Sequence, residues 1–216
     1  MSNLPDPFYI IIVLSMLALA PFMAVMVTSF IKIVVVLSLV RNALGIQQIP
    51  PNMVINGLAI ILTLYIMAPV GQDVYDILQN RDLSTKDFQG MRQAADLAKG
   101  PLKNFLMKHS DKRERQFFIK SAKTIWPEKK ARQIKDDDLI VLIPSFTVSE
   151  LTMAFQIGFL LYLPFVAIDL IVSNILLAMG MMMVSPMTIS LPFKLLLFVL
   201  LDGWARLIHG LVLTYG

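Results

Sequence analysis

The sequence contains no cysteine and only two histidines, His109 and His209, among its 216 residues. The absence of cysteine excludes disulfide bonds, thiolate nucleophiles and thiolate metal sites. Two histidines leave little for a histidine-rich metal site or a serine–histidine triad. Charged residues are also scarce, at 16% of the chain against about 25% in an average soluble domain. The chain therefore has few of the side chains on which enzyme active sites are built.

Hydrophobic residues, by contrast, make up 56% of the sequence, more than a soluble globule of this size could bury. The charged residues are segregated, since 26 of the 34 lie between Asp73 and Asp138. Outside that stretch the charge-free runs are 7–31, 42–72, 151–168 and 170–193. A helix needs about 20 apolar residues to cross a bilayer. We therefore expect an all-α integral membrane protein with about four long apolar helices.

This patterning predicts three parts: an N-terminal apolar hairpin over 1–72, a charged helical domain over 73–138, and a C-terminal apolar hairpin over 139–216. Charges of both signs are scattered through the middle part, which indicates a solvated surface rather than a nucleic-acid site. Asp6 and Pro7 are typical of a helix start. The Thr147–Glu150 stretch is typical of a capping box that opens the third apolar helix.

Lysines and arginines in short loops predict how the helices are oriented in the membrane. Lys32 and Arg41 have no acidic neighbours, so the segment 32–51 is expected to be a cytoplasmic loop. The domain over 73–138 then lies in the periplasm, one crossing further along the chain. Residues 1–6 contain no lysine or arginine, so we do not expect the first segment to be a cleaved signal peptide.

Enzyme motifs are missing from the sequence. We find no phosphate-binding loop, no zinc-binding H-E-x-x-H and no G-x-S-x-G nucleophile elbow. Asp169 and Asp202 could in principle form an intramembrane aspartyl pair, but neither has flanking glycines on its N-terminal side. We therefore predict no catalytic residues, no cofactor and no bound metal.

The isolated charges of the apolar regions are better explained as packing groups. An ionised side chain at the bilayer centre costs upwards of about 2.5 kcal/mol, so Asp169, Lys194, Asp202 and Arg206 should face protein or water. Asp202 and Arg206 stand four residues apart and could pair on one helix face or act between subunits. Asp169 and Lys194 lack a local partner, which favours a contact with a neighbouring helix or chain.

Methionines are clustered, with five of the chain's 14 in the nine positions 179–187. Three consecutive ones, Met181, Met182 and Met183, cannot share one helix face, so a loop or helix end is expected between Gly180 and Pro186. Methionine is flexible and can seal an irregular gap, so copies of this loop around an axis could form an apolar constriction. Simple filling of a helix break and copper(I) binding by the Met183–Met187 pair remain alternatives.

Several blocks of the sequence resemble one family. They are RNALGIQQIPPN at 41–52, GFLLYLPF at 158–165, IDL at 168–170, SNILLAMGMMM at 173–183, SPMTISLPFK at 185–194 and LDGW at 201–204. Together they resemble the R component of the type III secretion export apparatus, which is related to the flagellar P component. The resemblance covers the whole chain, is tightest over 26–72 and 140–204, and favours the injectisome branch.

The resemblance implies a component of the export gate in the bacterial inner membrane, embedded in the secretion-system base. In that family five copies, a homo-pentamer, assemble with the S and T components, and unfolded substrate proteins pass along the axis. Further partners would be other export-gate and needle-base proteins and membrane lipid, with no nucleic acid. The family's methionine gasket corresponds to Met181, Met182 and Met183 here. An independent small-solute or copper(I) transporter remains the alternative function.

Overall fold

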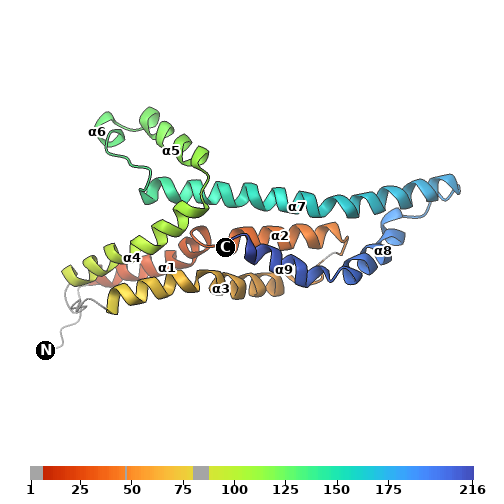
Figure 1. The fold of residues 1–216 in the computed structure, drawn as a ribbon, viewed down its shortest axis with the longest axis horizontal. Coiled ribbons are helices and arrows are strands. Elements are labelled where there is room, and N and C mark those ends of the chain that lie inside the picture. Colours follow the sequence, from red (N-terminus) through yellow and green to blue (C-terminus); the bar gives the residue numbers. More distant parts are fainter. Residues whose placement is uncertain (1–6, 47, 80–87) are drawn as a thin grey trace.

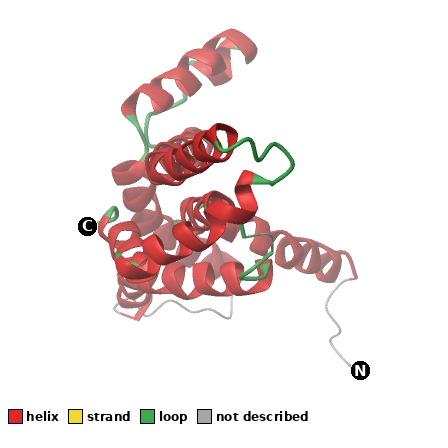
Figure 2. Cartoon of the chain, turned by 90° about the vertical axis from the view of Figure 1, so that its right-hand side faces the viewer, coloured by secondary structure: helices red, strands yellow, loops and turns green. Residues whose placement is uncertain are grey.

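The structure is a computed structural model that describes residues 7–46, 48–79 and 88–216. Throughout these residues the regular structure is helical, and no strand is present (Figure 2). The prediction of an all-α fold is confirmed. Helices α3 and α7 are each long and apolar enough to cross a membrane, and up to four crossings result if each of two bent helix pairs counts as one.

The N-terminal part is built from α1 (Pro7–Met26), α2 (Phe30–Ala43) and α3 (Asn52–Gln79). The helix axis turns by 62° between α1 and α2. Helix α2 forms the centre of the fold, and its residues Ile33, Val36, Leu37 and Val40 are almost fully buried. The expectation of a loop over 32–51 was wrong, because α2 extends to Ala43. The start of α1 at Pro7 agrees with the prediction, whereas its proposed cap, Asp6, lies outside the described residues.

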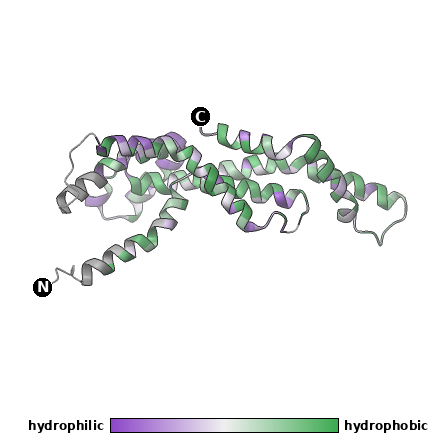
Figure 3. Cartoon of the chain, turned by 90° about the horizontal axis from the view of Figure 1, so that it is seen from below, coloured by the Kyte–Doolittle hydropathy of each residue, from purple (hydrophilic) through white to green (hydrophobic). Residues whose placement is uncertain are grey.

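The middle part contains α4 (Phe88–His109), α5 (Lys112–Ile125) and α6 (Glu128–Ala131). Helix α4 packs mainly against α3 and α7, whereas the main contact of α5 with a long helix is with α7. Hydrophilic residues are most concentrated at this end of the molecule, and hydrophobic ones predominate elsewhere (Figure 3). Helices α5 and α6 stand out from the side of α7, as both Figure 1 and Figure 2 show.

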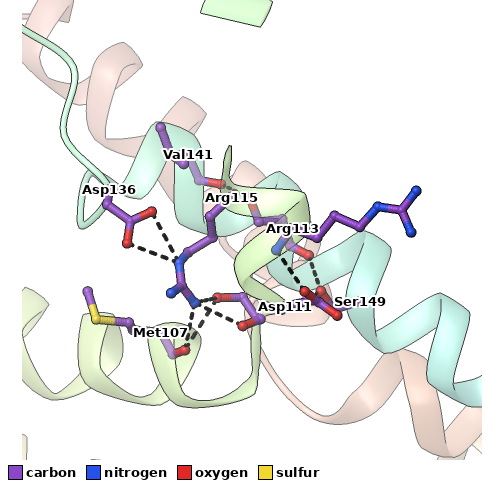
Figure 4. A network of polar contacts seen from close by, with 9 residues as sticks. Met107, Asp111, Arg113, Arg115, Asp136, Val141 and Ser149 are labelled. Atoms are coloured by element: carbon purple, nitrogen blue, oxygen red, sulfur yellow. Dashed lines mark hydrogen bonds and ion pairs between the residues drawn. The ribbon is translucent and has the colours of Figure 1, made fainter. Parts of the chain in front are cut away.

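A polar network holds the α4–α5 turn in place (Figure 4). The Asp111 side chain accepts a hydrogen bond from the Arg113 backbone N–H at 2.7 Å and so caps α5. The Arg115 guanidinium donates to the Met107 carbonyl at 3.2 Å and to both carboxylate oxygens of Asp136, each at 3.2 Å. These bonds fix the start of α5 relative to α4 and to the segment that leads into α7.

Helix α7 (Leu139–Ala178) has 40 residues and continues through Pro144 and Pro164. It packs along α2, where Gly158 permits close contact: a Cβ at this position would lie 2.3 Å from Leu39 Cδ1. The predicted capping box over 147–150 was wrong, because the helix already begins at Leu139. The hydroxyls of Thr147 and Ser149 instead donate to carbonyls one turn earlier, at 2.9 and 2.7 Å.

The C-terminal part returns along α7 as α8 (Pro186–Leu200) and α9 (Gly203–Leu213), which meet at 60°. Packing within the chain is incomplete. Only 11% of the most apolar window in each of the helices α3 and α7 is buried. A single copy therefore leaves most of its apolar surface to be covered by lipid or by other protein chains.

Candidate functional site

The methionine cluster lies in the loop that joins α7 to α8, at one extremity of the molecule (Figure 1). Helix α7 ends in a Schellman motif, with the Met181 N–H donating to the Leu176 carbonyl at 2.9 Å and Gly180 at φ 75°. Ser185 and Pro186 then start α8, and proline suits the first helical position. Helix breaks on both sides therefore produce the loop that the sequence predicted.

The three consecutive methionines project from this loop. Met181 is 47% exposed, Met182 81% and Met183 99%. Filling a helix break within one chain would bury these side chains, so the geometry does not favour that alternative. The loop offers a group of flexible apolar side chains to something outside the single chain.

Two to three turns away from this loop, the structure brings Asp169 and Lys194 together across α7 and α8. Lys194 Nζ lies 2.6 Å from Asp169 Oδ2 and donates to the Ala43 carbonyl at 3.1 Å. Ser190 Oγ donates to the other carboxylate oxygen of Asp169 at 2.5 Å. The lysine thus joins the two helices that carry the methionine loop to the C-terminal end of α2, where a cation also suits the helix dipole.

Asp202 and Arg206 are placed differently. Both are exposed, and no ion pair joins them within the described part of the chain. Their expected i, i+4 contact requires both residues to lie on one helix. Asp202 instead lies at the break before α9, with left-handed backbone angles of φ 53° and ψ 45°. Of the two alternatives for these residues, the local pair is absent from the described part of the chain, and a role between subunits stays a prediction.

Sequence reasoning missed a second ionic group, which lies in the core. Lys32 of α2 and Glu150 of α7 are each 1% exposed, and Lys32 Nζ lies 3.1 Å from Glu150 Oε1. The Tyr215 hydroxyl donates to the other oxygen of Glu150. The lysine ammonium also lies 3.6 Å from the centroid of the Tyr215 ring, a cation–π contact. The sequence held one indication of this pair: Lys32 and Glu150 are opposite charges that each border a long charge-free run.

Two titratable groups border this pair outside the candidate membrane spans. Burial, together with the neighbouring Glu150 carboxylate, raises the pKa of Tyr215, which keeps its hydroxyl protonated as a donor. Burial, together with the positive charges of Lys108 and Lys32, lowers the pKa of His109 to about 4. His109 is therefore neutral at neutral pH and adds no second cation beside Lys32.

A polar cavity of about 460 Å³ opens beside the ion pair, lined among others by Lys32, His109, Ser149 and Glu150. Among the charged groups that line it, Lys32 and Glu150 pair with each other. No cluster of three or more acidic or histidine side chains that could hold a metal ion occurs within 7–46, 48–79 and 88–216. The arrangement suits structural locking of α2 against α7 rather than catalysis.

Long apolar helices, a small charged lobe and buried interhelical ion pairs together define a helical membrane protein. Residues 13–211 match the FliP family. The chain is 59% identical over 216 residues, the full length of both proteins, to "Yop proteins translocation protein R" of Yersinia pestis. It is 54% identical over 202 residues, 92% of this chain and 93% of the relative, to "Hypersensitivity response secretion protein HrcR" of Ralstonia nicotianae.

A third relative, "Virulence protein YscR" of Salmonella typhimurium, is 50% identical over 215 residues, 99% of this chain and 100% of the relative. The chain therefore belongs to the FliP family, in the injectisome branch of R components of the type III secretion apparatus. The resemblance drawn from the sequence blocks is confirmed.

Proposed function

We propose that several copies of the chain, five by the family resemblance, form with the S and T components the inner-membrane pore through which unfolded proteins enter the secretion path. The chain contributes structure and a seal, without catalysis. The observation that carries this proposal is the exposed loop of Met181, Met182 and Met183 at the extremity of the α7–α8 pair. Exposed apolar side chains in such a group are typical of an interaction surface.

The seal follows from symmetry. In a closed ring of identical copies, the same loop of every copy lies at the same distance from the axis. Unbranched thioether side chains can meet there, fill an irregular gap and rotate aside when a polypeptide passes. An apolar constriction of this kind blocks water and ions when it is closed. The Asp169–Lys194 contact supports the proposal, because it fixes the two helices that carry the loop.

Cross-linking tests whether the loops meet. In this cysteine-free chain, Met182→Cys is expected to give covalent dimers with a short bis-maleimide in cells that also express the partner export proteins. Thr124→Cys, on the exposed side of α5 at the other end of the molecule, serves as the matched control and should remain monomeric. Equal dimer yields for both variants would contradict a shared axis at the methionine loop.

For the topology, we propose that the domain over 73–138 faces the periplasm. Lys32 does not contribute to this topology, because it is buried against Glu150 and cannot act as a loop charge. Arg41 remains: it is the only charged residue between 33 and 72. It lies in the last turn of α2, where it donates to the Pro50 carbonyl and the Asn52 side chain. Its charge favours a cytoplasmic α2–α3 turn.

Labelling tests this topology. Thr124→Cys is expected to react with a membrane-impermeant maleimide added to intact spheroplasts, since Thr124 is exposed on α5. Reaction only after lysis of the inner membrane would place the domain in the cytoplasm.

A role in secretion is favoured over that of an independent transporter, because the relatives are named as secretion and translocation proteins.

A further inference from the structure

The segment 112–135, here called the basic lobe, carries an unusual concentration of positive charge. It comprises α5, α6 and the residues that follow, and it holds nine lysines and arginines against two glutamates. The whole chain has a net charge of only +4. The rest of the protein is therefore net negative, and the positive charge is local to the lobe.

Most of this charge is not neutralised within the chain. In the lobe, Arg115 pairs with Asp136 and Arg132 with Glu128. Seven further basic side chains are exposed and have no ion-pair partner among the described residues: Lys112, Arg113, Lys120, Lys123, Lys129, Lys130 and Lys135. Two large apolar side chains of α5 are exposed in the same region, Phe117 at 59% and Ile125 at 76%.

The lobe is attached near the N-terminal end of α7, whose residues 139–149 carry no charge. The backbone N–H of Asp111, the residue before α5, donates to Ser149 Oγ of α7 at 2.8 Å (Figure 4). After Glu150, α7 has no charged residue until Asp169. The first turn of α5, with Lys112 and Arg113, is thus held beside the N-terminal third of a candidate membrane span.

We propose that the basic lobe rests on the anionic phospholipid headgroups of the bilayer that the chain's own helices enter. Basic side chains near a negatively charged membrane surface are attracted to it. Aromatic and aliphatic side chains among them add interfacial burial. Six of the seven unpaired groups are lysines. Their mobile point charges suit a diffuse anionic surface, whereas arginine suits fixed two-point recognition. This contact does not depend on the methionine seal and goes beyond it.

An acidic protein surface is the competing occupant. A lipid surface fits the observations better, because the lobe stands away from the other helices at the start of an apolar run and exposes apolar side chains between its cations (Figure 1). The chain's own membrane helices also hold a bilayer close to the lobe, whereas a protein partner would have to be recruited.

The experiment uses the full chain in nanodiscs, with an environment-sensitive fluorophore on Thr124→Cys. One set of discs contains phosphatidylcholine alone, and the other also contains phosphatidylglycerol; both carry a trace of lipid with a nitroxide quencher in its headgroup. We expect a blue shift and strong quenching in the phosphatidylglycerol discs and little in the others. Because exposed charges are screened by salt, the quenching should fall steeply as salt is raised.

Charge variants separate electrostatic attraction from simple proximity. Lys120→Gln, Lys123→Gln, Lys129→Gln and Lys130→Gln together should abolish most of the quenching, whereas arginine at the same four positions should retain it. All four side chains are exposed, so equal thermal unfolding of both variants is the folding control. Equal quenching in both kinds of disc, quenching that salt leaves unchanged, or quenching that appears only when partner export proteins are added would overturn the proposal.

Discussion

Replacing Met181, Met182 and Met183 together with alanine is expected to make the inner membrane leak ions while the complex still assembles. The three side chains project away from the chain, and Met183 is almost fully exposed. Their removal therefore deletes the contacts they make with other copies rather than contacts within the subunit. Alanine is too short to close an axial gap, so water and ions would enter the constriction.

The size of the stability change distinguishes a seal from a packed core. Truncating a buried methionine to alanine costs roughly 2–5 kcal/mol per site. Side chains that face a lumen should cost much less, so the amount of assembled complex should stay near that of the unchanged protein. The measurement is ion leakage, or slowed growth, in cells that co-express the partner proteins, together with the yield of complex on native gels.

A matched control removes equally exposed apolar side chains elsewhere. Leu196→Ala, Val199→Ala and Leu200→Ala on α8 delete comparable bulk away from the loop, and these residues are also exposed. This variant should not leak. A methionine variant that assembles and holds ions would show that the cluster is not the seal, whereas loss of assembly would favour the filler interpretation.

Removing one member of the buried Lys32–Glu150 pair is expected to cause the largest loss of stability in this chain. Glu150→Ala leaves the Lys32 ammonium in the core with the Tyr215 ring and the Met153 sulfur as its remaining contacts. Breaking a buried pair in this way costs about 3–5 kcal/mol, because the remaining charge is uncompensated. Thermal or detergent-induced unfolding of the purified protein measures the loss.

The double variant Lys32→Met with Glu150→Leu removes both charges while keeping their bulk. It should recover most of the stability, since a buried pair replaced by apolar side chains of similar volume is often neutral or stabilising. Lys130→Ala, on an exposed residue of α6, is the control and should change stability little. If the double variant is as unstable as Glu150→Ala, the loss of stability does not come from the unpaired charge of Lys32.

The features that could be predicted from the sequence are those set by neighbouring residues. Apolar length and the segregation of charge indicated long helices, and the Gly180 to Pro186 stretch indicated the break that holds the methionine loop. The errors came from contacts between distant residues. Lys32 was assigned to a loop and Glu150 to a helix cap because each was interpreted with its neighbours alone. Their partnership joins positions 118 residues apart, which only the packing of α2 on α7 reveals.

The contact between Asp169 and Lys194 could be predicted in part. Their isolation in apolar stretches indicated that each needs a partner from another helix, and the structure pairs them across the α7–α8 turn. The additional bond from Lys194 to the end of α2 could not be foreseen, because it depends on where that helix ends. The Asp202 backbone conformation likewise arises from the angle between α8 and α9, which residue spacing does not encode.

The length of α7 also fixes the distance between the basic lobe and the methionine loop. At about 1.5 Å per residue, its 40 residues extend about 60 Å, roughly twice the thickness of the hydrocarbon core of a bilayer. From Ser149, where the basic lobe is attached, to the methionine loop the helix extends roughly 45 Å. Where α7 crosses a bilayer, lobe and loop therefore lie at different depths, and the position of the lobe sets the depth at which the loops can meet. Inserting or deleting one helical turn between them would displace that meeting point by about 5 Å.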